Sequence, residues 1–302
     1  MSWLVFAISA IIYWVTMEKS ASVWDCPEFI TTFHKLEVGH PPGAPFYMLA
    51  YNVFAELFPG HGDWIAIAGN ALSGLLSGLT ILLLFRTISH LIRRTFILRT
   101  ASWREDAEIP ADYAWIALGS ALVGSLTYAF TDTFWYSAVE SEVYAFSSFF
   151  TALVFYLILK WEETRNPIKE DRWLLLTAYL MGLSVGVHLL NLLAIPAMAL
   201  VYYFKRTEKA TWRGGLVATL LSFVLIAVIL FGIIPGVPEV AGYFDLFFVN
   251  TLGLSYNSGL ICYVLVLALV MGLTVYASMR RPVPMTLLRV GFLSTCILLG
   301  IP

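Results

Sequence analysis

The sequence predicts an all-α protein, a polytopic bundle of transmembrane helices. Hydrophobic residues make up 59% of its 302 residues and charged residues only 13%, whereas soluble domains carry about 25% charged residues. Apolar stretches of about 20 residues, long enough to cross a bilayer as a helix, recur along the whole chain. The net charge of −2 supplies no basic field, so we expect no nucleic-acid partner.

About nine spans are expected. The first lacks a basic flank and is read as a retained helix rather than a cleaved signal peptide. The boundary near 188–190 is the weakest, because His188 and Asn191 only briefly interrupt an apolar run. The spans are 3–17, 62–85, 113–131, 141–161, 172–188, 190–204, 214–234, 258–279 and 284–302.

Positive residues predict the orientation of these spans. With alternating spans, every Lys and Arg except Lys19 and Lys35 falls on one side of the membrane. The positive-inside rule places that side in the cytoplasm. The opposite, outer face is rich in Asp and Glu, which contribute little to orientation, so its carboxylates call for a chemical explanation.

The longest outer segment, 18–61, is predicted to hold two short interfacial helices. Asp25-Cys26-Pro27-Glu28 has the form of a helix-capping box, and a helix over 26–38 would end at Gly39. His40-Pro41-Pro42-Gly43 cannot continue a helix, because proline lacks the backbone N–H. Apolar residues at helical spacing then predict a second helix over 45–58, lying in the membrane interface.

Two interpretations of the acidic pair stay open on spacing alone. Asp25 and Glu28 are either a cap or a catalytic pair, and the two are compatible because a capping carboxylate is well oriented. His34, His40 and Cys26 could join them as metal ligands, but no recognised spacing supports this. We therefore expect no metal and no other cofactor.

Three further polar clusters lie on the outer face. The segment TDTFWYSAVESEVYAFS (131–147) contains Glu140, Glu142 and Tyr144, which are either a solvated edge or part of a cavity. His188 and Asn191 end the fifth span, and a histidine there often serves helix packing instead. The segment DLFFVNTLGLSYNSG (245–259), with Asn257, is otherwise a polar turn.

Five pieces together resemble one known family: WDCPEF, KLEVGHPPGAPFY, TFWYSAVESEVYA, GLSVGVHLLNLL and FVNTLGLSYNSG. They are similar to bacterial membrane proteins of unknown function classed with the protein O-mannosyltransferases, within the GT-C glycosyltransferase superfamily. The resemblance covers essentially the whole chain. It implies one GT-C-like domain over 1–302, with a catalytic first outer loop (18–61) and a soluble C-terminal continuation that this chain lacks.

The resemblance also implies an activity and its site. A polyprenyl-phosphate-linked sugar, with mannose as the candidate, would be transferred to a Ser or Thr hydroxyl of an acceptor protein at the lipid surface. By position, Asp25 and Glu28 match the family's acidic pair. The implied location is the bacterial inner membrane, with the active site facing the periplasm.

The roles follow as hypotheses. Asp25 is expected to act as the general base, and Glu28 to orient Asp25 or the acceptor. Lys35, His40 and His188 are the candidates for neutralising the leaving phosphate, because the outer face has so few cations. The expected substrate-binding residues are Lys35, His40, Glu140, Glu142, Tyr144, His188, Asn191 and Asn257.

Two other classes of protein compete with the enzyme. A transporter or flippase for a lipid-linked or anionic solute would also use intramembrane acids and histidines. Such carriers usually bind near the bilayer midplane within repeats, whereas here the ionisable residues gather at one surface and no repeat is apparent. A structural membrane anchor would leave the acidic loop with no role beyond capping.

Overall fold

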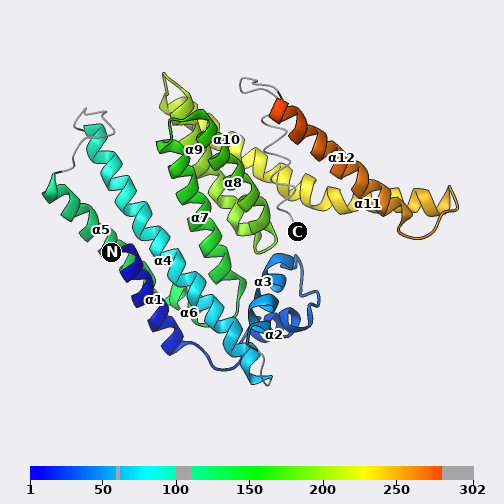
Figure 1. Ribbon diagram of the computed structural model, residues 1–302, viewed down its shortest axis with the longest axis horizontal. Coiled ribbons are helices and arrows are strands. Elements are labelled where there is room, and N and C mark those ends of the chain that lie inside the picture. The colour runs from blue at the N-terminus through cyan, green and yellow to red at the C-terminus, as the bar shows by residue number, and fades with distance from the viewer. Residues whose placement is uncertain (59–61, 100–109, 281–302) are drawn as a thin grey trace. The chain divides into compact units, whose positions relative to one another are not determined.

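The computed structural model describes residues 1–58, 62–99 and 110–280, and all regular secondary structure in these ranges is helical (Figure 1). The predicted all-α class is therefore confirmed. The expected ninth span, 284–302, lies outside the described residues. The chain divides into two compact units. The described residues of the first are 1–58, 62–99, 110–160 and 183–191, and those of the second are 161–182 and 192–280.

The first unit is built around the long helix α4 (Asp63–Arg99), which packs against α1 (Ser2–Thr16) and α5 (Ala111–Ala129). Buried apolar side chains from all three helices form its core, among them Val5, Ile81, Phe85 and Ala121. The hydroxyl of Tyr13 donates a hydrogen bond to the Ala129 carbonyl at 2.8 Å, which satisfies a buried polar group. The other helices of this unit are α2 (Cys26–Lys35), α3 (Pro45–Glu56), α6 (Asp132–Val139) and most of α7 (Val143–Glu163).

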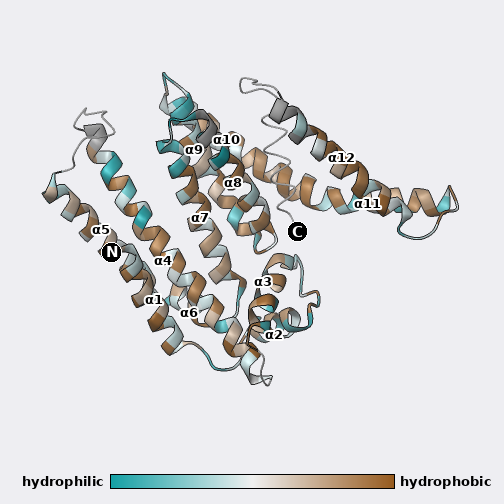
Figure 2. Ribbon diagram, in the orientation of Figure 1, coloured by the Kyte–Doolittle hydropathy of each residue, from teal (hydrophilic) through white to brown (hydrophobic). Residues whose placement is uncertain are grey.

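Within the first unit, α2 and α3 lie at the end where α1 finishes and where α4 and α7 begin (Figure 1). The basic residues Arg86, Arg93 and Arg94 belong to the opposite, C-terminal half of α4. Figure 2 shows hydrophilic residues in the C-terminal half of α4, and hydrophilic residues among apolar ones in α2. The acidic outer loop and the basic residues of α4 thus occupy opposite ends of this unit.

The second unit contains most of α8 (Pro167–Val185), the 3₁₀ turn Leu189–Ala194 in part, and the helices α9 (Ile195–Arg206) and α10 (Trp212–Val228). Glu170 of α8 pairs with Lys205 and Arg206 of α9 at 2.9 Å each, so a buried carboxylate is neutralised by two cations. A π-helical turn, Ile229–Ile233, joins α10 to α11 (Ile234–Asn250), and α12 (Ser258–Arg280) packs on α11.

Residues 234–250 correct one prediction. The sequence analysis ended the seventh span at 234 and read the segment before 258 as an outer connection, whereas the structure continues the helix to Asn250. This stretch contains two prolines, and neither ends the helix. Pro235 lies in the first turn of α11, where proline is tolerated, and Pro238 is accommodated inside the helix.

The span count stays a prediction. Four helical segments are long and apolar enough to cross a membrane, and a fifth counts if Ala111–Ala129 and Asp132–Val139, bent by 67°, form one span. Three expected spans coincide with shorter apolar helices, Ser2–Thr16, Arg172–Val185 and Ser258–Leu273. Eight of the nine predicted spans therefore fall on helices, but not all of these helices are long and apolar enough to count as candidate membrane spans. The four segments are Trp64–Phe96, Val143–Glu163, Leu189–Arg206 and Trp212–Asn250.

Candidate functional site

Asp25 immediately precedes α2, as the capping interpretation required, but its side chain makes no cap hydrogen bond. Glu28 does not complete a capping box either, because its carboxylate accepts hydrogen bonds from His40 instead. Of the two interpretations left open, the capping box is therefore wrong, and the catalytic pair stays a hypothesis. The exposed carboxylate of Asp25 is left free at the start of α2.

The end of α2 also differs from the prediction. The helix stops at Lys35 rather than near residue 38, because Leu36 adopts a left-handed conformation (φ 52°) and reverses the chain. Gly39 is thus not the residue that terminates the helix. A Cβ atom there would lie 3.2 Å from Glu28 Oε1, so glycine lets the returning chain approach that carboxylate closely.

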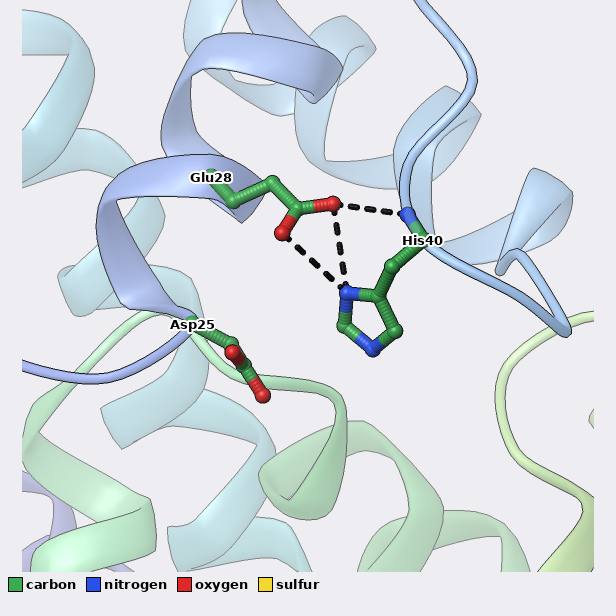
Figure 3. Close-up of side chains that lie close together, drawn as sticks. All are labelled: Asp25, Glu28 and His40. Carbon is green, nitrogen blue, oxygen red and sulfur yellow. Dashed lines mark hydrogen bonds and ion pairs between the residues drawn. The ribbon is translucent and has the colours of Figure 1, made fainter.

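Glu28 and His40 form a hydrogen-bonded pair (Figure 3). The His40 backbone N–H donates to Glu28 Oε1 at 2.7 Å, and His40 Nδ1 lies 3.2 Å from both carboxylate oxygens. The backbone hydrogen bond from His40, and then the bond from its ring, lower the pKa of Glu28 below its usual range. A carboxylate bonded to Nδ1 fixes the proton there in the neutral ring and leaves Nε2 turned away from Glu28.

A cleft of about 70 Å³ lies beside this pair, entirely within the first unit. Ligand pockets usually measure about 300–1,000 Å³, so this one has room for reacting groups but not for a whole lipid-linked sugar. Four segments build it: the start of α2, the 40–44 turn, the start of α7 and the residues after α8. The lining residues are Asp25, Phe29, His40, Pro42, Gly43, Ala44, Glu142, Val143, Tyr144, Val187 and His188.

Glu142 is the most buried acid in the cleft, with 6% of its surface exposed. Among the residues that the structure describes, none forms a hydrogen bond or an ion pair with its side chain. Burial, reinforced by the charges of Glu140 and Asp25, raises the pKa of Glu142 to about 7. This carboxyl group is therefore partly protonated at neutral pH.

His188 is half-buried, and its ring centre lies 5.5 Å from that of Tyr144. Its Nδ1 accepts a hydrogen bond from the Leu190 backbone N–H at 3.1 Å, so the neutral ring carries its proton on Nε2. Burial lowers the pKa of His188. This histidine can offer an N–H donor to the cleft, but it is a poor source of positive charge at neutral pH.

The remaining predicted site residues lie elsewhere. Lys35 is exposed in the last turn of α2 and does not line the cleft, and Asn257 is exposed in the second unit. Glu140 accepts a hydrogen bond from Ser22. Asn191 is fully buried, and its side chain binds Ser147, Thr151 and the Ser184 carbonyl, so it holds the segment after α8 against α7.

The sequence analysis did not identify several residues that shape the site. Asn70 of α4 is fully buried and donates to the carbonyls of Glu18 and Ser20, while its Oδ1 accepts from Ser141 at 2.6 Å. A lone asparagine inside an apolar span was the available signal. The Gly186 carbonyl accepts the first N–H groups of α3, from Phe46 and Tyr47, and no sequence pattern indicated this.

Asp25, Glu28 and His40 are the described residues that could hold a metal ion, because each offers a ligand atom and these atoms all lie within 4.8 Å of one another. Cys26 is buried and His34 is exposed, and neither belongs to this group. Because Glu28 and His40 already satisfy each other, we assign no metal here. The expectation that the protein needs none stays a prediction.

The fold and the site define a helical membrane protein with an acidic cleft at one end of its N-terminal unit. The chain belongs to the family described as the Protein O-mannosyl-transferase TMEM260 N-terminal domain, whose model matches residues 25–211 and so begins at Asp25. The resemblance drawn from the sequence motifs is thereby confirmed at the level of the family.

Two curated relatives carry the same name. Protein O-mannosyl-transferase TMEM260 of Mus musculus is 25% identical over 220 residues, which cover 72% of this chain and 28% of the relative. Protein O-mannosyl-transferase tmem260 of Dictyostelium discoideum is 21% identical over 235 residues, covering 74% and 26%. The chain thus spans about a quarter of the length of these relatives. No solved structure matches the chain.

Proposed function

We propose that this chain carries the catalytic centre of a membrane glycosyltransferase. The enzyme would move a sugar, with mannose the first candidate, from a polyprenyl phosphate to a Ser or Thr hydroxyl of a protein. The observation that carries the proposal is the free Asp25 carboxylate at a cleft, beside the Glu28–His40 pair, in a chain whose relatives are named protein O-mannosyl-transferases.

In the proposed reaction the acceptor oxygen attacks the anomeric carbon, and the bond from that carbon to the phosphate oxygen breaks. Asp25 accepts the proton of the acceptor hydroxyl, a role that typically contributes about 10²–10⁴-fold to the rate. Asp25 is suited to act as the base because its carboxylate makes no cap hydrogen bond. The carboxylate of Glu28, by contrast, is already hydrogen-bonded to His40.

Glu28 takes a different role from the one expected from the sequence. It contacts His40, so we assign it to positioning that ring rather than Asp25 or the acceptor. The Nε2 edge of His40 is then available to a phosphate oxygen of the donor. Of the three groups considered for the leaving phosphate, His40 is the one best supported, because Lys35 lies outside the cleft and His188 has a lowered pKa.

The proposed location follows from the ends of the first unit. The start of α2, which lines the acidic cleft, and the basic C-terminal half of α4 lie at opposite ends of this unit (Figure 1). This separation supports an extracytoplasmic site under the positive-inside rule. For a bacterial chain this side is the periplasm. The acceptor protein and the polyprenyl donor belong to the same proposal.

The substitution Asp25→Asn tests it. Transfer from a polyprenyl-phosphate sugar to an acceptor peptide should fall at least about 10²-fold, while membrane insertion and protein level stay unchanged. Asp132→Asn is the matched control, because Asp132 is an exposed aspartate that begins α6 outside the cleft. Wild-type transfer by Asp25→Asn would refute the assignment. Movement of the lipid-linked sugar from one leaflet of a vesicle membrane to the other, without transfer to an acceptor, would favour the alternative function as a flippase.

A further inference from the structure

Breaking the bond between sugar and phosphate leaves a second negative charge on the lipid phosphate. Phosphate monoesters bind this second proton with a pKa of about 6, so a group that titrates near neutral pH is well matched to supply it. Among the described residues, no Lys or Arg lines the cleft, and it holds the two acids Asp25 and Glu142. A departing phosphate would meet negative charge there unless a proton or a cation is provided.

Glu142 combines three properties that are not expected of an acidic residue that only supports the fold. It is more than nine-tenths buried, its side chain has no partner among the described residues, and it lines the same cleft as Asp25. An ionised carboxylate so placed is costly, because burial removes water without supplying a hydrogen bond. By contrast Glu140, two residues earlier, is satisfied by Ser22.

We propose that Glu142 is a catalytic proton donor, which protonates the lipid phosphate as it leaves the sugar while Asp25 accepts the proton of the acceptor hydroxyl. This inference rests on the proposed glycosyl transfer and adds a second catalytic carboxyl group to it. It names the start of α7, not only the first outer loop, as part of the catalytic centre.

The step balances. The acceptor oxygen forms a bond to the anomeric carbon, and the electron pair of the broken bond passes to the phosphate oxygen. That oxygen takes the proton of Glu142, and Asp25 takes the proton of the acceptor. One turnover therefore ends with Asp25 protonated and Glu142 ionised, and a proton returned from Asp25 to Glu142, through solvent in the cleft, restores the starting state.

The surroundings of Glu142 support a protonated resting state. Its pKa of about 7 reflects burial first, then the charges of Glu140 and Asp25, with His40 opposing. Below this pH the group can donate, and above it the proton is lost, so activity should fall as pH rises through about 7. The other titratable groups that face it are Tyr47 of α3, Tyr144 of α7 and His188.

Glu142→Gln tests the inference in the full-length protein, because glutamine keeps the shape but cannot release a proton. Transfer from a polyprenyl-phosphate mannose to an acceptor peptide would be followed from about pH 5.5 to 9. In the wild type we expect kcat to decline about tenfold per pH unit above pH 7. In Glu142→Gln, kcat at pH 6 should be about 10²–10⁴-fold lower, and this alkaline decline should disappear. Glu37→Gln, an exposed glutamate of the same outer loop, is the matched control.

A second measurement does not depend on activity. Infrared difference spectra of the purified protein between pH 6 and 8 should show a protonated carboxyl band that titrates near pH 7 and is missing in Glu142→Gln. Absence of such a band in the wild type, or an unchanged rate and alkaline decline in Glu142→Gln, would overturn the inference while leaving the glycosyl transfer in place. A wild type without transfer at any pH would defeat both.

Discussion

At the scale of single residues, three nearby carboxyl groups have three different environments and hence three proposed roles. Asp25 is exposed and free, Glu28 is held by His40, and Glu142 is buried without a partner. Environment rather than residue type separates a base, a positioning group and a proton donor. The sequence shows the three acids but not which of them is engaged.

The Glu28–His40 pair predicts coupled losses. Glu28→Gln and His40→Ala should each lower kcat/KM for glycosyl transfer, because the first change loosens the hold on the His40 ring and the second removes that ring. The double variant should lose little more than the worse single variant, since the two residues act as one unit. Transfer assays on the four proteins measure this, and losses that simply add would show that the two residues act independently.

At the scale of elements, the site depends on how closely α4 approaches its neighbours. Gly69 of α4 is buried, and a Cβ atom there would lie 2.9 Å from the Phe33 ring and would collide with the Ser141 hydroxyl. That hydroxyl donates to Asn70, which also holds the segment between α1 and α2. One methyl group at Gly69 would therefore disturb α2, through Phe33, and the segment just before α7, through Ser141. Both segments contribute residues to the cleft.

Gly69→Ala should be destabilising by about 1–3 kcal/mol, as overpacking in a filled core typically is. It should lower the thermal midpoint and reduce transfer together. Gly119→Ala in α5 is the matched control, because a Cβ atom there meets nothing within 4 Å and alanine favours a helix over glycine. Equal thermal midpoints for the two variants would contradict this account of the α4 contact.

At the scale of the whole molecule, the proposal depends on which side of the membrane the cleft faces. The basic residues around α9 and in the C-terminal half of α4 should face the cytoplasm, and the turn after α2 should face outward. The native cysteines that the structure describes are Cys26, which is buried, and Cys262, which is partly exposed.

Cysteine labelling checks the orientation. In a background without native cysteines, Val38→Cys, at a position 93% exposed, should react with an impermeant maleimide in intact cells. Lys209→Cys, also at an exposed position, should react only after permeabilisation. The reverse pattern would place the cleft in the cytoplasm and remove the support for an extracytoplasmic donor and acceptor.

The sequence by itself determined the helical membrane class, the two short helices of the first outer loop and the family. These follow from local chemistry: apolar runs that must satisfy their backbone inside lipid, prolines that begin helices, and short motifs with a fixed order. It also pointed to Asp25, Glu28, His40, Glu142 and His188 as a group worth inspecting, although their roles stay proposals.

Only the tertiary structure decided how these side chains are engaged. The left-handed turn at Leu36 precedes the segment that brings His40 back onto Glu28, so Glu28 does not complete the capping box that its spacing from Asp25 suggested. Burial at the start of α7 raises the pKa of Glu142, while the same loop leaves Glu140 bonded to Ser22. Hydrogen-bond partners and loss of water depend on residues far apart in the chain, so no local pattern could assign them.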